Sequence, residues 1–193
     1  MDKEKTLIEA AGNGKIETVK EMIAAGADIN AADPDGKTAM TWAARKGHLD
    51  IVKLLAENSA DVNIRTVDKW SALMYAVRNG HSETAEYILE HNAETNIRTA
   101  DGWTPLIVAA STGHADIAEM LIEKGAEINV KDIFGLTPLI WAARNGNLQI
   151  VILFLEKGAK PGETDNTGKT AIEWARIMGY TSVVEMIEKA GNK

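Results

Sequence analysis

Short apolar runs occur in pairs along the chain, at spacings that favour amphipathic helices. Residues 7–11 place Leu, Ala and Ala three and four positions apart, and residues 19–23 do the same with Val, Met and Ile. Side chains at such spacings share one face of a helix. Glycine and asparagine at residues 12–14 interrupt the pattern between the two runs. The sequence therefore predicts two short helices joined by a turn.

This pair of runs returns every 33 residues. A glycine after the first run and an asparagine after the second keep the same step, at Gly14, Gly47, Gly80, Gly113, Gly146 and Gly179, and at Asn30, Asn63, Asn96 and Asn129. A fixed period of this length is typical of stacked repeats, none of which can bury its apolar face alone. We expect one domain, residues 1–193, with a first capping repeat at 1–32, internal repeats at 33–65, 66–98, 99–131 and 132–164, and a closing capping repeat at 165–193.

The residues inside the unit carry a family resemblance. The clearest copy runs from Asp101 to Asn129, DGWTPLIVAASTGHADIAEMLIEKGAEIN, with Thr-Pro-Leu, Ala-Ala, Gly-His and Gly-Ala-Glu in that order. This arrangement resembles the ankyrin repeat, and the resemblance covers residues 5–191. It implies an all-α solenoid of stacked helix-turn-helix units with protruding hairpin-like loops. Because that fold is a scaffold whose variable positions select the partner, the resemblance alone says little about function.

Residues 59–96 depart most from the repeat pattern. Ser59 and Asn92 stand where a glycine is expected at the C-terminus of a helix, and Lys69 replaces the glycine of a turn. Such positions favour glycine because it adopts positive φ without steric cost. We therefore expect this section to be the least stable part of the chain.

Composition limits the function without naming it. The chain has 193 residues, 45% hydrophobic and 25% charged, and no cysteine, which excludes disulfides and thiolate chemistry. Its longest aliphatic and aromatic run, Ile150 to Leu155, is too short to span a bilayer, and its first residues lack the apolar core of a secretory signal. The net charge of -7 argues against nucleic acid. We expect a cytoplasmic monomer that binds neither membranes nor nucleic acid, with self-association through exposed aromatic residues as the alternative.

Three features suggest chemistry at first sight, and each has a simpler interpretation. Residues 162–170 resemble a P-loop, but five residues separate its glycines instead of four, and Gly-Lys-Thr also occurs at 36–38. His48, His81 and His114 follow the repeat, so packed helices would hold them about 8 to 10 Å apart, too far to share one zinc ion. Carboxylates of the second helices follow helical spacing, which is typical of a solvated face. We expect no catalytic residue, no metal and no cofactor.

The informative positions lie beside the buried helical stripe. In each unit, the residue before the Ala-Ala pair and those three and four positions later form a separate face, which carries aromatic and basic side chains. In proteins that this sequence resembles, that face and the loop tips line a concave binding surface. Tryptophan, tyrosine and arginine are enriched at binding hot spots. The predicted partner-binding residues are Trp42, Arg45, Arg65, Trp70, Tyr75, Arg78, Arg98, Trp103, Ile133, Phe134, Trp141 and Arg144.

These residues predict a non-catalytic protein-interaction module. All five tryptophans fall at positions that the ankyrin scaffold does not need for its own packing, and the cations beside them favour a partner segment that offers carboxylates and apolar side chains. The opposing interpretation is that Trp42, Trp141 and Trp174 stack on adjacent helices and seal the inner surface, and that the cations are ordinary surface charge.

Two other functions stay open at this stage. Some ankyrin domains bind methylated lysine in an aromatic cage, and Trp70, Tyr75 and Trp103 match part of such an arrangement. Against this function, Arg78 would repel a cation there. The chain would also fit an engineered ankyrin scaffold with a selected binding face. Its irregular repeats, and the loss of the histidine from Thr-Pro-Leu-His, favour a natural history instead.

Overall fold

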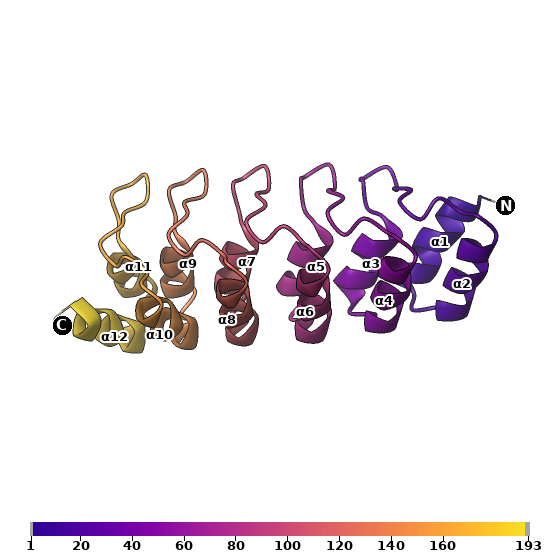
Figure 1. The fold of residues 1–193 in the computed structure, drawn as a ribbon. Helices are drawn as coiled ribbons and strands as arrows, with labels where there is room; N and C mark the ends of the chain where they lie inside the picture. The colour runs from indigo at the N-terminus through magenta and orange to yellow at the C-terminus, as the bar shows by residue number, and fades with distance from the viewer. Residues whose placement is uncertain (1, 192–193) are drawn as a thin grey trace. The chain divides into compact units, whose positions relative to one another are not determined.

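The computed structural model describes residues 2–191, and the chain forms two compact units, Met1–Ile97 and Arg98–Lys193. Each unit contains three helix-turn-helix pairs, and hairpin-like loops project from the helices (Figure 1). Within the described residues there are twelve helices, and the only strand-like pairing is a single bridge in each of two hairpins. The expected all-α repeat fold with protruding loops is confirmed. That the two units form one domain across residues 1–193 stays a prediction.

The N-terminal unit arranges six helices in two rows. They are α1 Lys3–Gly12, α2 Ile16–Ala24, α3 Ala39–Lys46, α4 Leu49–Glu57, α5 Ala72–Arg78 and α6 Ser82–Glu90. The first helices of the pairs pack on one another, α1 on α3 and α3 on α5, and the second helices follow as α2 on α4 and α4 on α6. Ala43, Ala44 and Ala76 in the first row are fully buried, and their small side chains let the helices approach closely.

The C-terminal unit repeats this arrangement. Its helices are α7 Pro105–Thr112, α8 Ala115–Glu123, α9 Pro138–Arg144, α10 Leu148–Glu156, α11 Ala171–Met178 and α12 Thr181–Gly191. α7 packs on α9 and α9 on α11, while α8 packs on α10 and α10 on α12. Arg176, which stands where the other repeats have a buried alanine or valine, is exposed and pairs with Glu188 at 2.7 Å. Helix α11 therefore presents a charged side chain where the first helices of the other repeats bury an apolar one. Among residues 2–191, no helix has the length and apolar character needed to cross a membrane.

The first helices of the internal repeats are N-capped by residues with hydroxyl side chains. Thr38 Oγ1 accepts the backbone N–H of Thr41 at 3.2 Å, and Thr104 Oγ1 accepts that of Ile107 at 3.3 Å. These bonds satisfy N–H groups that have no partner inside the helix. Pro105 follows Thr104 at a position where its missing N–H costs nothing. Thr38 and Thr104 are therefore the N-caps of α3 and α7.

Hairpins within a unit are joined through their backbones. The N–H of Val67 donates to the carbonyl of Asp35 at 2.9 Å, and the C-terminal unit has equivalent bonds. Gly36 makes this approach possible, because a Cβ atom there would lie only 3.0 Å from Thr66 Cα. Its φ of 79° also favours glycine. Each hairpin is therefore positioned by its neighbour as well as by its own helix.

Three non-glycine residues among those described have positive φ: Ser59 at 68°, Lys69 at 62° and Asn92 at 64°. They are the three positions where the sequence lacks an expected glycine. A left-handed conformation costs most residues about 1–2 kcal/mol, and asparagine less. The backbone requirement inferred from the repeat is confirmed, while the lower stability of residues 59–96 stays a prediction.

Candidate binding surfaces

Three tryptophans tie a first helix to the hairpin before it. In each case the indole N–H donates to the carboxylate nine residues earlier: Trp42 to Asp33 at 3.0 Å, Trp141 to Asp132 at 2.9 Å and Trp174 to Asp165 at 2.8 Å. The same carboxylates accept backbone N–H groups of their own hairpins. These indoles thus stabilise the scaffold. The prediction that the scaffold needs none of the five tryptophans for its packing is wrong for these three.

Hydrogen bonds keep two of these hairpin carboxylates ionised. Burial alone would raise the pKa of Asp165, but hydrogen bonds outweigh it and lower the pKa to about 2. The donors are the backbone N–H of Lys169, the N–H and hydroxyl of Thr167 and the indole of Trp174. The pKa of Asp33 is lowered in the same way, since bonds from its own tryptophan and hairpin outweigh the effect of burial. Both hairpins therefore carry a fixed negative charge at neutral pH.

Arginines on the first helices stack between aromatic rings of successive repeats. The distances from guanidinium Cζ to ring centroid are 5.1 Å for Arg45 and Trp42, 5.8 Å for Arg45 and Tyr75, 5.3 Å for Arg144 and Trp141, and 4.6 Å for Arg144 and Trp174. Contacts of this kind contribute about 0.5–1 kcal/mol each at exposed sites. They hold the guanidinium groups in place on the face that the sequence predicts to bind a partner.

A hollow of about 350 Å³ on α3 and α5 gathers three cations in the N-terminal unit. We term it the basic hollow, and its lining is Lys37, Arg45, Tyr75, Arg78 and Asn79. Lys37 Nζ pairs with Asp35 at 2.6 Å. Within residues 2–191, neither Arg45 nor Arg78 has a carboxylate at ion-pair distance. The hollow therefore keeps a net local positive charge, from Arg45 and Arg78, on a chain whose net charge is negative.

Two predicted aromatic residues meet at the edge of the basic hollow. The ring centroids of Trp70, from the hairpin, and Tyr75, from α5, are 5.2 Å apart with their planes at 43°. Arg78 Cζ lies 5.4 Å from the Trp70 ring. Tyr75 is only 9% exposed, so it supports the neighbouring side chains more than it presents a surface of its own. The structure thus brings these three predicted residues together with Arg45.

The C-terminal unit presents a more apolar set of the predicted residues. Trp103 and Trp141 pack edge to face, with centroids 4.7 Å apart and planes at 61°. Ile133 and Phe134 at the tip of a hairpin are 54% and 55% exposed. Exposed large apolar side chains at a loop tip are available to contact a partner.

The two remaining predicted arginines, Arg65 and Arg98, donate hydrogen bonds to backbone carbonyls of hairpin loops. Arg65 Nε donates to the carbonyl of Lys69 at 3.3 Å, and the guanidinium of Arg98 donates to the carbonyl of Lys131 in the next hairpin. Both side chains are on exposed residues. Their geometry gives them a structural role, and a contact with a partner stays a prediction.

His48 and His81 connect each first helix to the following pair. The Nε2 atom of His48 lies 3.3 Å from the carbonyl of Gly12, and that of His81 lies 3.2 Å from the carbonyl of Arg45. Both histidines therefore have a structural role. The described part of the chain contains no cluster of three or more histidine and carboxylate side chains arranged to hold a metal ion.

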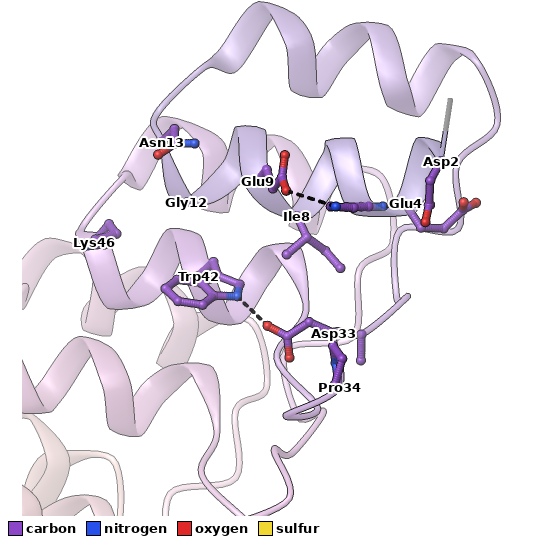
Figure 2. Close-up of a pocket in the computed structure, with 12 residues that line it drawn as sticks. Asp2, Glu4, Ile8, Glu9, Gly12, Asn13, Asp33, Pro34, Trp42 and Lys46 are labelled. Atoms are coloured by element: carbon purple, nitrogen blue, oxygen red, sulfur yellow. Dashed lines mark hydrogen bonds and ion pairs between the residues drawn. The ribbon is translucent and has the colours of Figure 1, made fainter.

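A pocket of about 760 Å³ lies between α1 and the hairpin and helix α3 that follow it (Figure 2). We term it the end pocket. Ile8 and Gly12 of α1, Pro34 of the hairpin and the ring of Trp42 form its apolar lining. Figure 2 shows Ile8 directed from α1 toward the hairpin, and Trp42 bound to Asp33 at the opposite side.

Charged side chains surround this apolar lining. Four carboxylates and two lysines contribute: Asp2, Glu4, Glu9, Asp33, Lys5 and Lys46. The sequence pattern predicts no site here, and only Trp42 of the lining is among the predicted partner-binding residues. The available signal is Gly12, which replaces the arginine found at the same repeat position in Arg45, Arg78 and Arg144.

Stacked helix pairs, capping hydroxyls and paired hairpins define a helical repeat scaffold of the kind used for protein recognition. A family model described as ankyrin repeats in three copies matches residues 7–99, 61–132 and 128–193. The chain therefore belongs to the ankyrin-repeat family. A search of curated proteins finds no match. Ankyrin repeats are generic protein–protein interaction modules, and the chain shares that general role.

Proposed function

We propose that this chain is a non-catalytic interaction module that binds an acidic segment of a partner protein through the aromatic and basic face of its first helices. The observation that carries the proposal is the basic hollow, where Lys37, Arg45 and Arg78 converge beside Tyr75. Lys37 is paired with Asp35. Arg45 and Arg78, however, have no carboxylate at ion-pair distance within residues 2–191, and a bound carboxylate would relieve the repulsion between these two guanidinium groups. The free energy of binding would therefore contain a favourable electrostatic contribution from the start.

Stacking prepares the arginines of the hollow for this role. Arg45 lies against Trp42 and Tyr75, and Arg78 lies against Trp70. A side chain that is already ordered loses less conformational entropy on binding. The planar guanidinium also offers two parallel N–H donors to a carboxylate, a geometry that a lysine lacks. These features support recognition of aspartate or glutamate side chains.

The predicted residues of the C-terminal unit complete the proposal. Trp103, Trp141 and Arg144 continue the pattern of stacked rings and cations, and Ile133 and Phe134 offer exposed apolar surface. These residues would contact apolar side chains of the same class of partner. Recognition of methylated lysine is less favoured, because Arg78 lies 5.4 Å from the Trp70 ring and would repel a second cation there.

Selection from a random peptide library displayed on phage tests this function. We expect the enriched peptides to contain clustered aspartate or glutamate beside an apolar residue. For the best peptide, Arg45→Gln and Arg78→Gln should each raise the Kd about 10-fold, equal to about 1.4 kcal/mol, and added salt should weaken binding of the wild-type chain.

Arg176→Gln is the matched control, because Arg176 is an exposed arginine of α11 outside the basic hollow. Its Kd for the same peptide should equal that of the wild-type chain. Circular dichroism establishes that all variants keep the helical fold. Enriched peptides without acidic residues, or a Kd unchanged by both hollow variants, would contradict the proposal.

A further inference from the structure

We propose that the end pocket is a second binding site, which takes an arginine side chain from a basic segment of a partner protein. The guanidinium would stack on the side of Trp42 that faces α1, and the carboxylates around the pocket would accept its N–H groups. This site differs from the basic hollow in position and in the sign of its charge. The inference does not rest on the function proposed above.

The chain itself shows which group occupies the equivalent place in another repeat. Arg144 reaches from α9 to the ring of the following repeat, where its Cζ atom lies 4.6 Å from the centroid of Trp174. Arg45 reaches from α3 toward Tyr75 in the same way, at 5.8 Å. An arginine of one repeat thus covers the aromatic ring of the next, and this geometry recurs in both units.

Gly12 breaks that pattern at the first repeat. It stands 33 residues before Arg45, so the side chain that would cover Trp42 from α1 is missing. A Cβ atom on Gly12 would lie 3.5 Å from Trp42 Cβ and 3.6 Å from Cε3 of its ring, which is ordinary contact distance. Helix α1 therefore comes close to the indole but places no cation on it.

The other side of the same indole is already occupied. Arg45 lies between Trp42 and Tyr75, and so covers the side of the ring that faces α5. An aromatic ring carries negative potential on both faces, and each face attracts a cation. Lys37 Nζ, 5.6 Å from the ring centroid, lines the basic hollow together with Arg45. The side toward α1 is thus a cation-stacking position that no side chain of α1 fills.

Helix α1 stands where other repeats place a hairpin residue beside the ring. In the C-terminal unit, Trp103 of the preceding hairpin packs against Trp141 at 4.7 Å. Three repeats earlier the corresponding residue is Glu4, which lies in helix α1 instead of a hairpin. Pro34 lines this side and has no N–H, whereas Val67 at the equivalent position donates one to the neighbouring hairpin. The edge of the first hairpin is therefore closed to backbone pairing, and the pocket is open to a side chain.

The charge around the pocket favours a cation. Asp2 and Glu4 each accept a backbone N–H, and their carboxylates keep further lone pairs for another donor. The ion pair between Glu9 and Lys5 is long, at 4.0 Å, and exposed, so it holds Glu9 only weakly. Lys46 lies at the opposite end of the pocket from Asp2 and Glu4 (Figure 2). Glu9, one turn before Gly12 on α1, is thus the carboxylate placed to accept N–H groups of a guanidinium over Trp42, while Asp2 and Glu4 add negative charge at the far end of the pocket.

Arginine fits this combination better than lysine does. Its flat guanidinium stacks on an indole and presents a fork of N–H donors to carboxylates, whereas an ammonium group is compact and strongly hydrated. Its aliphatic stem would lie along the apolar lining formed by Ile8 and Pro34. The partner is therefore expected to present an arginine in an exposed basic segment.

Titration of the 15N-labelled chain with a blocked Gly-Gly-Arg-Gly-Gly peptide tests this site. The probe signal is the indole N–H of Trp42, which Trp42→Phe identifies by its disappearance. We expect a saturable shift of this signal with the arginine peptide. The same peptide with citrulline at its centre keeps the shape without the charge, and should bind at least about fivefold more weakly.

Two substitutions at Gly12 make the test specific. Gly12→Arg would place the chain's own guanidinium over Trp42, as Arg144 does over Trp174, and should abolish the peptide-induced shift. Gly12→Ala adds only a Cβ atom at ordinary contact distance and should preserve it. Glu9→Gln should weaken binding without changing the fold.

Three results would overturn the inference: no shift at Trp42, equal binding of the citrulline peptide, or full binding by Gly12→Arg. Each of these can occur while the basic hollow still binds acidic peptides, so failure here is distinguishable from failure of the proposed function.

Discussion

Replacing Asp165 with asparagine should destabilise the closing repeat by about 2 kcal/mol at neutral pH. The side chain is 7% exposed, and its Oδ1 atom accepts the backbone N–H groups of Thr167 and Lys169 at 2.8 and 3.0 Å. Its Oδ2 atom accepts the indole N–H of Trp174 at 2.8 Å. Asparagine has nearly the same shape but turns one acceptor into an NH₂ donor. One set of N–H groups would then face a donor and lose its bonds.

The magnitude follows from the pKa of Asp165, which is lowered from its ordinary value of 3.8 to about 2. Each unit of pKa corresponds to about 1.4 kcal/mol, so the ionised carboxylate stabilises the folded chain by about 2 kcal/mol. For a lowered pKa, this stabilisation is fully present above the unfolded value. It is lost as the pH falls through the folded value, between about pH 4 and pH 2. The stabilities of the wild type and Asp165→Asn should therefore converge across that window.

Urea unfolding followed by circular dichroism, at neutral pH and at steps down to about pH 2, measures this difference. Because repeat proteins can unfold in parts, hydrogen exchange of residues 165–191 should show where the loss lies. Trp174→Phe removes one donor and should cost about 1 kcal/mol. Glu185→Gln, at an exposed position of α12, serves as the charge control and should change little. A difference between Asp165→Asn and wild type that stays constant down to about pH 2, or is absent at neutral pH, would refute the reasoning.

Two further predictions concern backbone geometry and use the same urea measurement. Lys69→Gly should raise the free energy of unfolding by about 0.5–1 kcal/mol, since it removes a lysine held in the left-handed conformation at φ 62°. Asn92→Gly should raise it by only a few tenths of a kcal/mol, because asparagine adopts this conformation more readily. Equal increases in the free energy of unfolding for both variants would contradict this prediction. Gly47→Ala should destabilise the N-terminal unit by more than about 2 kcal/mol, because the new Cβ atom would lie 2.6 Å from the Nδ1 atom of His81. The φ of 72° at residue 47 adds backbone strain for alanine. An unchanged midpoint of urea unfolding would contradict this prediction.

The fold is readable from the sequence because stacked repeats reuse one local pattern. The repeat indicates where a glycine is required, and Ser59, Lys69 and Asn92 adopt left-handed conformations at the positions that lack one. Capping by Thr38 follows from the same comparison. The division between Ile97 and Arg98 is not readable in this way, because it depends on how densely each part of the chain contacts itself.

The candidate sites are only partly readable, because a position on a helix face does not reveal what a side chain touches. One missed signal is present in the sequence: Asp33 precedes Trp42 by nine residues, and the same pair recurs in two other repeats. Where Thr66 stands at the aspartate position, the residue nine later is Tyr75 instead of tryptophan. The recurrence of this pair of residues predicts that the tryptophans of the first helices are hydrogen-bonded to the aspartates of the preceding hairpins.

Trp42 shows how one residue position can determine the charge preference of a surface. On the α5 side, Arg45 covers the indole and joins Lys37 and Arg78 in the basic hollow, so this side is suited to a partner carboxylate. On the α1 side, Gly12 supplies no cation, and four carboxylates and two lysines line the pocket beside the ring. The difference arises from glycine replacing arginine at a single repeat position. Repeat scaffolds can therefore acquire a binding site by losing a side chain as well as by gaining one.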